Sequence, residues 1–126
     1  MVETNPTYSF TQVIAWQKAH AFVLLVYKLT SKFPNTEKYC LCSQFQRAAI
    51  SIAANIAEGY KKKSSSDKLR FFNISQGSIE ECRYYIILSK DLNYITEKEQ
   101  IELINSLEET SKLLNAYCKG VMTVHD

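Results

Sequence analysis

Residues 39–60, YCLCSQFQRAAISIAANIAEGY, decide the fold, because their side chains repeat at the spacing of an α-helix. An apolar face recurs at steps of three and four residues and consists of Leu41, Phe45, Ala48, Ala49, Ile52 and Ile56. Proline is absent from the stretch, and the first glycine, Gly59, suits a helix C-terminus. The pattern therefore predicts a helix with one buried side.

A second, polar line runs along the same predicted helix and consists of Gln44, Arg47, Ser51, Asn55 and Glu58. It carries short or fork-shaped hydrogen-bonding groups between alanines, which is typical of a surface that meets another helix closely. If the chain turns back near residue 64, Arg47 lies opposite Glu80 and Glu81. By the same rule Ser51 lies near Gly77. We expect a largely satisfied polar network between two antiparallel helices.

The same periodicity and the end signals predict three further helices. The four are expected at about 10–33, 38–60, 66–92 and 97–119, between tails at 1–9 and 121–126. Ser9 and Gln12 form a capping box for the first helix, and Pro34 follows its end. Ser65 or Ser66 caps the third helix.

The fourth predicted helix opens with a second capping box, formed by Thr96 and Glu99, and ends at Gly120. Its apolar stripe is Ile101, Ile104, Leu107, Ser111, Leu114 and Cys118. Helices of this length joined by short loops run antiparallel. The sequence thus predicts one all-α domain, an up-down-up-down four-helix bundle.

Several classes of protein lack support in the sequence. The two histidines, His20 and His125, have no glutamate three residues before them, so a di-metal carboxylate site is not expected. The four cysteines lack metal-ligand spacing and are expected as free thiols. Nucleotide-binding glycine motifs and nucleophile constellations are also absent. We therefore expect no enzymatic activity, no cofactor and no metal.

The chain also has no apolar run long enough to span a bilayer and no secretory signal, so we expect a cytoplasmic protein without a membrane partner. The first helix is apolar almost all round between residues 19 and 29. A helix with more than one apolar face in a small protein indicates a second buried surface, such as a contact between subunits.

Charge is distributed unevenly along the chain. Residues 1–79 carry ten Lys and Arg against four Asp and Glu, and residues 80–126 carry five against nine. The basic residues concentrate at Lys61, Lys62, Lys63, Lys68 and Arg70, beside Tyr60 as a stacking group. Such a cluster is either a solubilising loop at the tip of the bundle or a surface that contacts nucleic-acid phosphates.

The sequence also resembles a known family. The pattern QxxRAAxSIxxNIAEG at 44–59, followed by FxIxxGSIxE at 72–81, is similar to the four-helix-bundle proteins encoded in 23S ribosomal RNA intervening sequences. FPxxExYxL at 33–41 and VxxWQxA at 13–19 also match, so the resemblance covers roughly 10–119. Three positions depart from the family pattern: Cys40 replaces a usual Gly, Ala53 a usual Pro and Ser75 a usual Ala.

The resemblance implies a ring-shaped homopentamer without catalytic residues. It also implies kinship with the accessory protein of diversity-generating retroelements, a basic pentamer that binds nucleic acid and a reverse transcriptase. We therefore expect a homo-oligomer that binds RNA or DNA through its basic cluster. The alternative is a scaffold that docks a protein partner, such as a reverse transcriptase, on its acidic fourth helix or its first helix.

Overall fold

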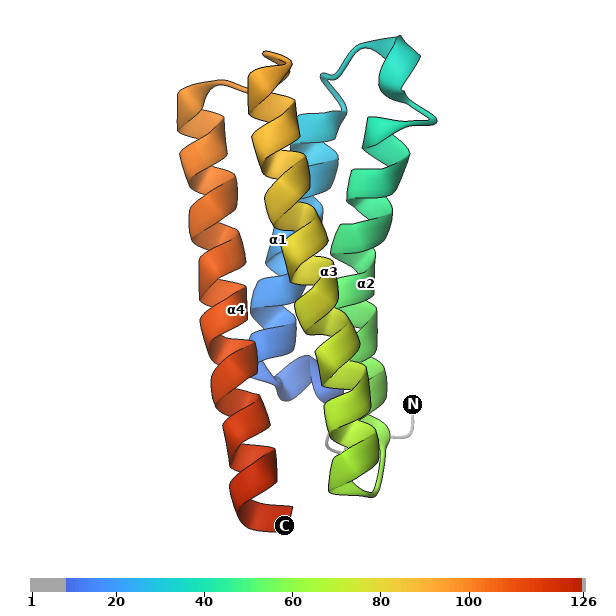
Figure 1. Ribbon diagram of the computed structural model, residues 1–126, viewed down its shortest axis with the longest axis vertical. Helices are drawn as coiled ribbons and strands as arrows, with labels where there is room; N and C mark the ends of the chain where they lie inside the picture. Colours follow the sequence, from blue (N-terminus) through green and yellow to red (C-terminus); the bar gives the residue numbers. More distant parts are fainter. Residues whose placement is uncertain (1–8, 126) are drawn as a thin grey trace, which may run out of the picture.

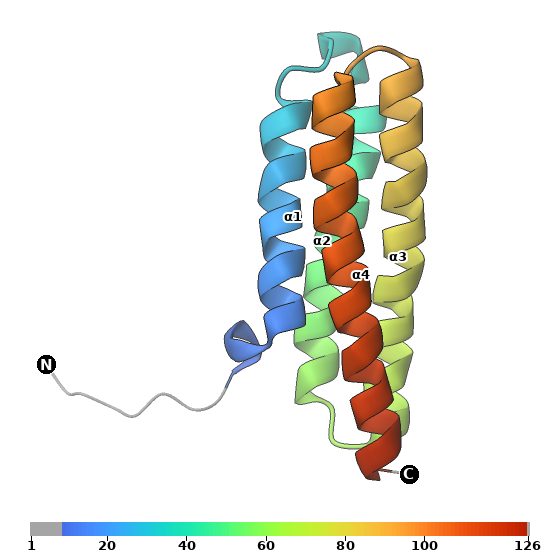
Figure 2. The ribbon, with the colours of Figure 1, turned by 90° about the vertical axis from the view of Figure 1, so that its left-hand side faces the viewer.

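The computed structural model describes residues 9–125, and this part of the chain holds four α-helices, two short 3₁₀ turns and no strand. The helices are α1 (Ile14–Thr30), α2 (Leu41–Lys61), α3 (Ser65–Asp91) and α4 (Glu97–His125). Successive helices run in opposite directions, and α4 returns to lie beside α1 (Figures 1 and 2). The expected all-α four-helix architecture is confirmed.

Apolar side chains spaced three and four residues apart on every helix fill the space between the four rods. Fully buried large residues include Phe22 of α1, Phe45, Ile52 and Ile56 of α2, Phe72, Ile79 and Ile86 of α3, and Leu103, Leu107 and Leu114 of α4. Burial of each such side chain stabilises the fold by about 1.5–3 kcal/mol. One continuous core therefore runs the length of the bundle.

The first helix is shorter than expected at both ends. Ser9 caps only the 3₁₀ turn η1 (Phe10–Gln12), because its hydroxyl accepts a hydrogen bond from the Thr11 amide. Val13 has an extended backbone and separates this turn from α1. The interruption brings the Phe10 ring edge-on to Trp16, with 5.0 Å between ring centroids. After α1 the chain passes through a second turn, η2 (Asn35–Glu37), before α2 begins.

The ends of α3 and α4 carry well-formed caps. Ser64, one residue before the predicted candidates, accepts from the Asp67 amide at 3.2 Å and starts α3. The predicted box at Thr96 and Glu99 forms in both directions, at 2.9 and 3.1 Å. Between these helices Asn93 has a φ of 63°, a left-handed conformation that Asn tolerates better than most residues.

Two expectations for α4 were wrong. Its buried stripe contains Leu103 in place of Ile101, whose side chain is 51% exposed, although Leu107, Leu114 and Cys118 are buried as predicted. The helix also continues past Gly120 to His125. A lone glycine inside a helix costs only about 1 kcal/mol relative to alanine. Continuing the helix buries Val121 in the core, which compensates for that cost.

The seam between α2 and α3 depends on small residues. Gly59 lies against Phe72, and an added Cβ would stand 2.6 Å from that ring. Ser75 donates a hydrogen bond from its hydroxyl to the Ile52 carbonyl at 2.8 Å. The two helices approach closely along the stretch that the sequence pattern marked out.

Candidate nucleic-acid interface

The basic cluster lies at the end of the bundle where α2 turns into α3. Lys61 is the last residue of α2, and Lys62 leaves the helix with an extended backbone. Only residues 62–64 separate the two helices, so the lysines are held close to both. Figure 1 shows this turn at the end of the bundle opposite the α3–α4 connection.

Lys61 and Lys63 are exposed, and the Lys62 ammonium lies 4.9 Å from the centre of the Phe71 ring. Among the described residues, none of these three lysines forms an ion pair. Arg70 lies over the same Phe71 ring at 5.0 Å and pairs with Asp67 at 3.9 Å on the surface. Cation–π contacts of this kind are worth about 0.5–1 kcal/mol at exposed sites and hold the cations near the ring.

Phe71 is the residue that sequence reasoning missed. Its neighbour Phe72 is fully buried in the core. Adjacent positions on a helix point about 100° apart, so a second aromatic beside a core position must lie at the flank. The position of Phe71 next to a core residue was the signal in the sequence that could have identified it. The Phe71 ring is half-buried, and the Lys62 and Arg70 cations lie 4.9 and 5.0 Å from its centre.

Lys68 is half-buried against the end of α2. Its ammonium donates hydrogen bonds to the carbonyls of Gly59 and Tyr60, which are among the last carbonyls of α2. Burial there lowers the pKa of Lys68. The side chain therefore caps the C-terminus of α2. The Lys68 ammonium lies 5.5 Å from the centre of the Tyr60 ring. Both residues are half-buried, whereas Lys61 and Lys63 are exposed.

The predicted polar network forms only at its centre. Asn55 donates to the Ser51 hydroxyl at 3.1 Å, and Ser51 and Ser78 share a hydrogen bond of 2.8 Å across the α2–α3 seam. Its outer members Gln44, Arg47, Glu58, Glu80 and Glu81 are all exposed. The expected pairing of Arg47 with Glu80 or Glu81 is absent from the described part of the chain.

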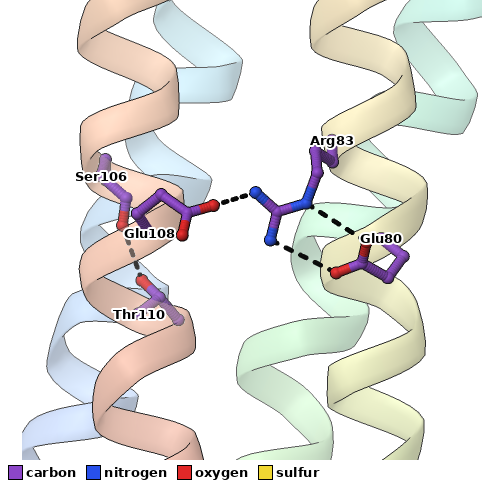
Figure 3. A network of polar contacts seen from close by, with 5 residues as sticks. All are labelled: Glu80, Arg83, Ser106, Glu108 and Thr110. Carbon is purple, nitrogen blue, oxygen red and sulfur yellow. Dashed lines mark hydrogen bonds and ion pairs between the residues drawn. The ribbon is translucent and has the colours of Figure 1, made fainter.

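Glu80 pairs with Arg83 instead, one turn along α3, at 3.2 Å. The same guanidinium bonds to Glu108 on α4, so Arg83 bridges two helices (Figure 3). Arg83 was not among the residues predicted from the sequence to form the network. An i, i+3 match between Glu80 and Arg83 on one helix was the signal that competed with the longer-range pairing.

Neither a metal-binding cluster nor a membrane-spanning helix occurs among the described residues. His, Cys, Asp and Glu side chains do not gather there in groups of three that could hold a metal ion. None of the helices described is long and apolar enough to cross a membrane. His20 is exposed and stacks on Trp16, with 5.0 Å between ring centroids.

An all-α bundle with a basic turn at one end is the class of protein that these features define. The sequence profile of the 23S rRNA-intervening sequence protein family matches residues 11–116, and the chain belongs to this family. A solved structure from Bacteroides thetaiotaomicron, a protein of unknown function from the S23 ribosomal protein family, is similar with a TM-score of 0.78 and 27% identity. The match covers 84% of this chain and 96% of that one. Comparison with curated proteins gave no significant match.

Proposed function

We propose that the protein is a non-enzymatic homo-oligomer that binds RNA or DNA through the basic turn between α2 and α3. The observation that carries this proposal is the group formed by Lys61, Lys62 and Lys63, which have no carboxylate partner among the described residues. Arg70 extends the group along α3 beside the half-buried Phe71 ring. We place the protein in the cytoplasm, which four free thiols support.

Assembly of several copies is the second part of the proposal. Two large apolar side chains of α1, Ile14 and Leu24, are each 58% exposed. Contact between copies would cover such side chains. We propose the ring-shaped homopentamer that the family resemblance implies, together with the kinship to retroelement accessory proteins. Repetition of the basic turn around a ring raises the strength of binding without any new kind of contact.

The test is a titration of the protein against fluorescent single- and double-stranded RNA and DNA at two salt concentrations. Multi-angle light scattering on the same sample gives the number of subunits. Each phosphate contact contributes about one unit to the slope of log K against log salt. We expect the triple variant Lys61→Ala, Lys62→Ala, Lys63→Ala to bind more weakly and to show a shallower slope.

The matched control removes the same charge elsewhere. Lys28, Lys98 and Lys112 are exposed and form no ion pair among the described residues. Their combined replacement by Ala leaves binding largely unchanged if the basic turn is the site. Equal loss in both triple variants would mean that net charge alone drives binding. An intact oligomer that binds no nucleic acid at low salt would refute the function.

A scaffold that docks a protein partner is the second candidate. The observation in its favour is a set of exposed apolar side chains on α3, namely Ile74 at 46%, Tyr84 at 56% and Ile87 at 50%. A partner such as a reverse transcriptase would cover them. Apolar docking depends little on salt, whereas phosphate binding weakens steeply as salt rises. The salt series therefore separates the two candidates.

A further inference from the structure

The end of α1 and the start of α2 lie at the end of the bundle opposite the basic turn (Figure 1). The residues there line a cleft of about 690 Å³. It is bounded by the last turn of α1, the turn η2 and the first turns of α2. Its walls include Tyr27, Ser31, Lys38, Tyr39, Ser43 and Arg47. The volume lies within the range of about 300–1,000 Å³ that small-molecule sites occupy.

The floor of the cleft is fixed by hydrogen bonds. Gln46 donates from Nε2 to the Thr30 hydroxyl at 3.0 Å, and that hydroxyl donates to the Val26 carbonyl at 2.7 Å. The Cys42 thiol lies 3.7 Å from the Thr30 carbonyl oxygen. Burial raises the pKa of the Cys42 thiol, so this group stays neutral. The site is thus held in shape and adds no negative charge of its own.

Positive charge in the cleft is not compensated. Lys38 and Arg47 line it, no carboxylate does, and neither cation forms an ion pair among the described residues. Glu37 is the nearest acid in sequence, but its carboxylate accepts from the Tyr94 hydroxyl at 2.8 Å and from the Leu41 amide at 3.4 Å. Two cations in a cleft without acids attract a group with negative charge.

The cleft also offers an aromatic surface. Tyr39 is 85% exposed, and the Lys38 ammonium lies 5.5 Å from the centre of its ring. Tyr27 stands on the α1 side and is 43% exposed. Exposed tyrosine rings beside cations are well suited to a planar, electron-poor ring that stacks on them. The ligand that satisfies both features carries a phosphate and an aromatic base.

We propose that this cleft binds a nucleoside phosphate, with the phosphate between Arg47 and Lys38 and the base against Tyr39. Arg47 matters most because its planar guanidinium can bind a phosphate through two parallel hydrogen bonds. The proposal gives a role to Arg47, which does not pair with Glu80 or Glu81 across the α2–α3 seam. It does not require the basic turn, so it stands or falls separately from the proposed function.

The test is calorimetric titration of the oligomer with AMP, GMP, CMP and UMP, and with adenosine and inorganic phosphate as partial ligands. Arg47→Gln and Lys38→Gln each remove one charge from an exposed position. We expect each to weaken binding of the best mononucleotide about tenfold or more, because charge-assisted hydrogen bonds are lost. Lys28→Gln, on α1 outside the cleft, is the matched control and leaves binding unchanged.

The proposal would be overturned if no mononucleotide binds, or if Arg47→Gln binds as well as the unchanged protein. Adenosine that binds as tightly as AMP would also overturn it, since the phosphate would then be dispensable. A 5′-phosphorylated oligonucleotide that competes with AMP would identify the end of a strand as the source of the nucleotide. A competitor without effect would identify the free nucleotide. The triple lysine variant of the basic turn retains AMP binding under this proposal.

Discussion

The seam between α2 and α3 and the contact between α1 and α4 join neighbouring helices by different means. Short side chains bond inside the seam: Ser75 to the Ile52 carbonyl, and Ser78 to Ser51, both at 2.8 Å. These groups are buried or half-buried. Hydrogen bonds between buried short groups hold two backbones at one distance, because neither partner has a long stem that could adapt.

The α1–α4 contact has its polar links at the surface. Lys18 pairs with Glu109 at 3.1 Å, where the two side chains are 43% and 53% exposed. Lys32, two residues after the end of α1, pairs with Glu99 at 2.7 Å, where the lysine side chain is 60% exposed and the glutamate side chain 21% exposed. Long side chains in water adapt to small shifts of the helices, and exposed pairs contribute about 0–1 kcal/mol. The seam therefore sets the geometry of the bundle, whereas the surface pairs only add to its stability.

The largest expected effect comes from filling the seam. We expect Gly59→Ala to lower the free energy of unfolding by about 1–3 kcal/mol, because an added Cβ would stand 2.6 Å from the buried Phe72 ring. That ring packs on Tyr117, with 5.2 Å between centroids, and cannot move away freely. Urea denaturation at matched protein concentration measures the change.

Gly77 is the matched control on α3, since a Cβ there meets no atom within 4 Å. Gly77→Ala should raise the free energy of unfolding by about 0.5–1 kcal/mol, because alanine restricts the unfolded chain and favours the helix. Opposite signs for the two glycines would support the close seam. Stabilisation by both substitutions would show that Phe72 has space to move, and the comparison with the α1–α4 contact would fail.

The level of the hairpin could be predicted, but not the rotation of its helices. A turn near residue 64 placed Ser51 beside Gly77, and Ser51 bonds to the adjacent Ser78. The same rule set Arg47 level with Glu80, yet Arg47 lines the cleft beside α1. Sequence spacing fixes height along a helix. A side chain at the border of the apolar face can point toward either of two adjacent helices. Which helix it contacts depends on the packing of all four helices.

The same limit explains the other misses. Because Ile101 and Leu103 are both apolar, the buried stripe of α4 could begin at either residue. Packing in the assembled core buries Leu103 and leaves Ile101 exposed. Lys68 was grouped with the other cations by sequence proximity, although its helical position turns it toward the α2 carbonyls. The cleft joins η2 to two helices, so periodicity within one helix carries no signal for it.

A smaller effect is expected from one hydrogen bond of the seam. Ser75→Ala removes the donor to the Ile52 carbonyl and should cost about 0.5–1.5 kcal/mol before the gain in helix propensity. Ser111→Ala on α4 provides that gain alone, since Ser111 makes no hydrogen bond among the described side chains. The difference between the two variants in urea denaturation isolates the bond. Equal effects would mean that the seam is held by shape without help from Ser75.

The smallest expected effect belongs to the surface pair of Lys32 and Glu99. The bond from Lys32, followed by that from the Thr96 amide, lowers the pKa of the Glu99 carboxyl below its ordinary value of 4.5. The folded state therefore binds its proton less readily than the unfolded state does. The stabilisation is complete above about pH 4.5 and is lost as the pH falls through the lowered pKa.

Glu99→Gln should remove this acid-dependent part and cost less than about 1 kcal/mol at neutral pH. Gln still accepts from the Thr96 amide in a capping box, so the substitution isolates the charge. Thermal unfolding followed from about pH 7 down to about pH 3 measures this change. Glu102→Gln, at an exposed position of α4 without an ion pair among the described residues, keeps the original acid dependence. If Glu99→Gln costs more than Ser75→Ala at neutral pH, the α1–α4 contact is more than an addition to stability, and the ranking of the two contacts is reversed.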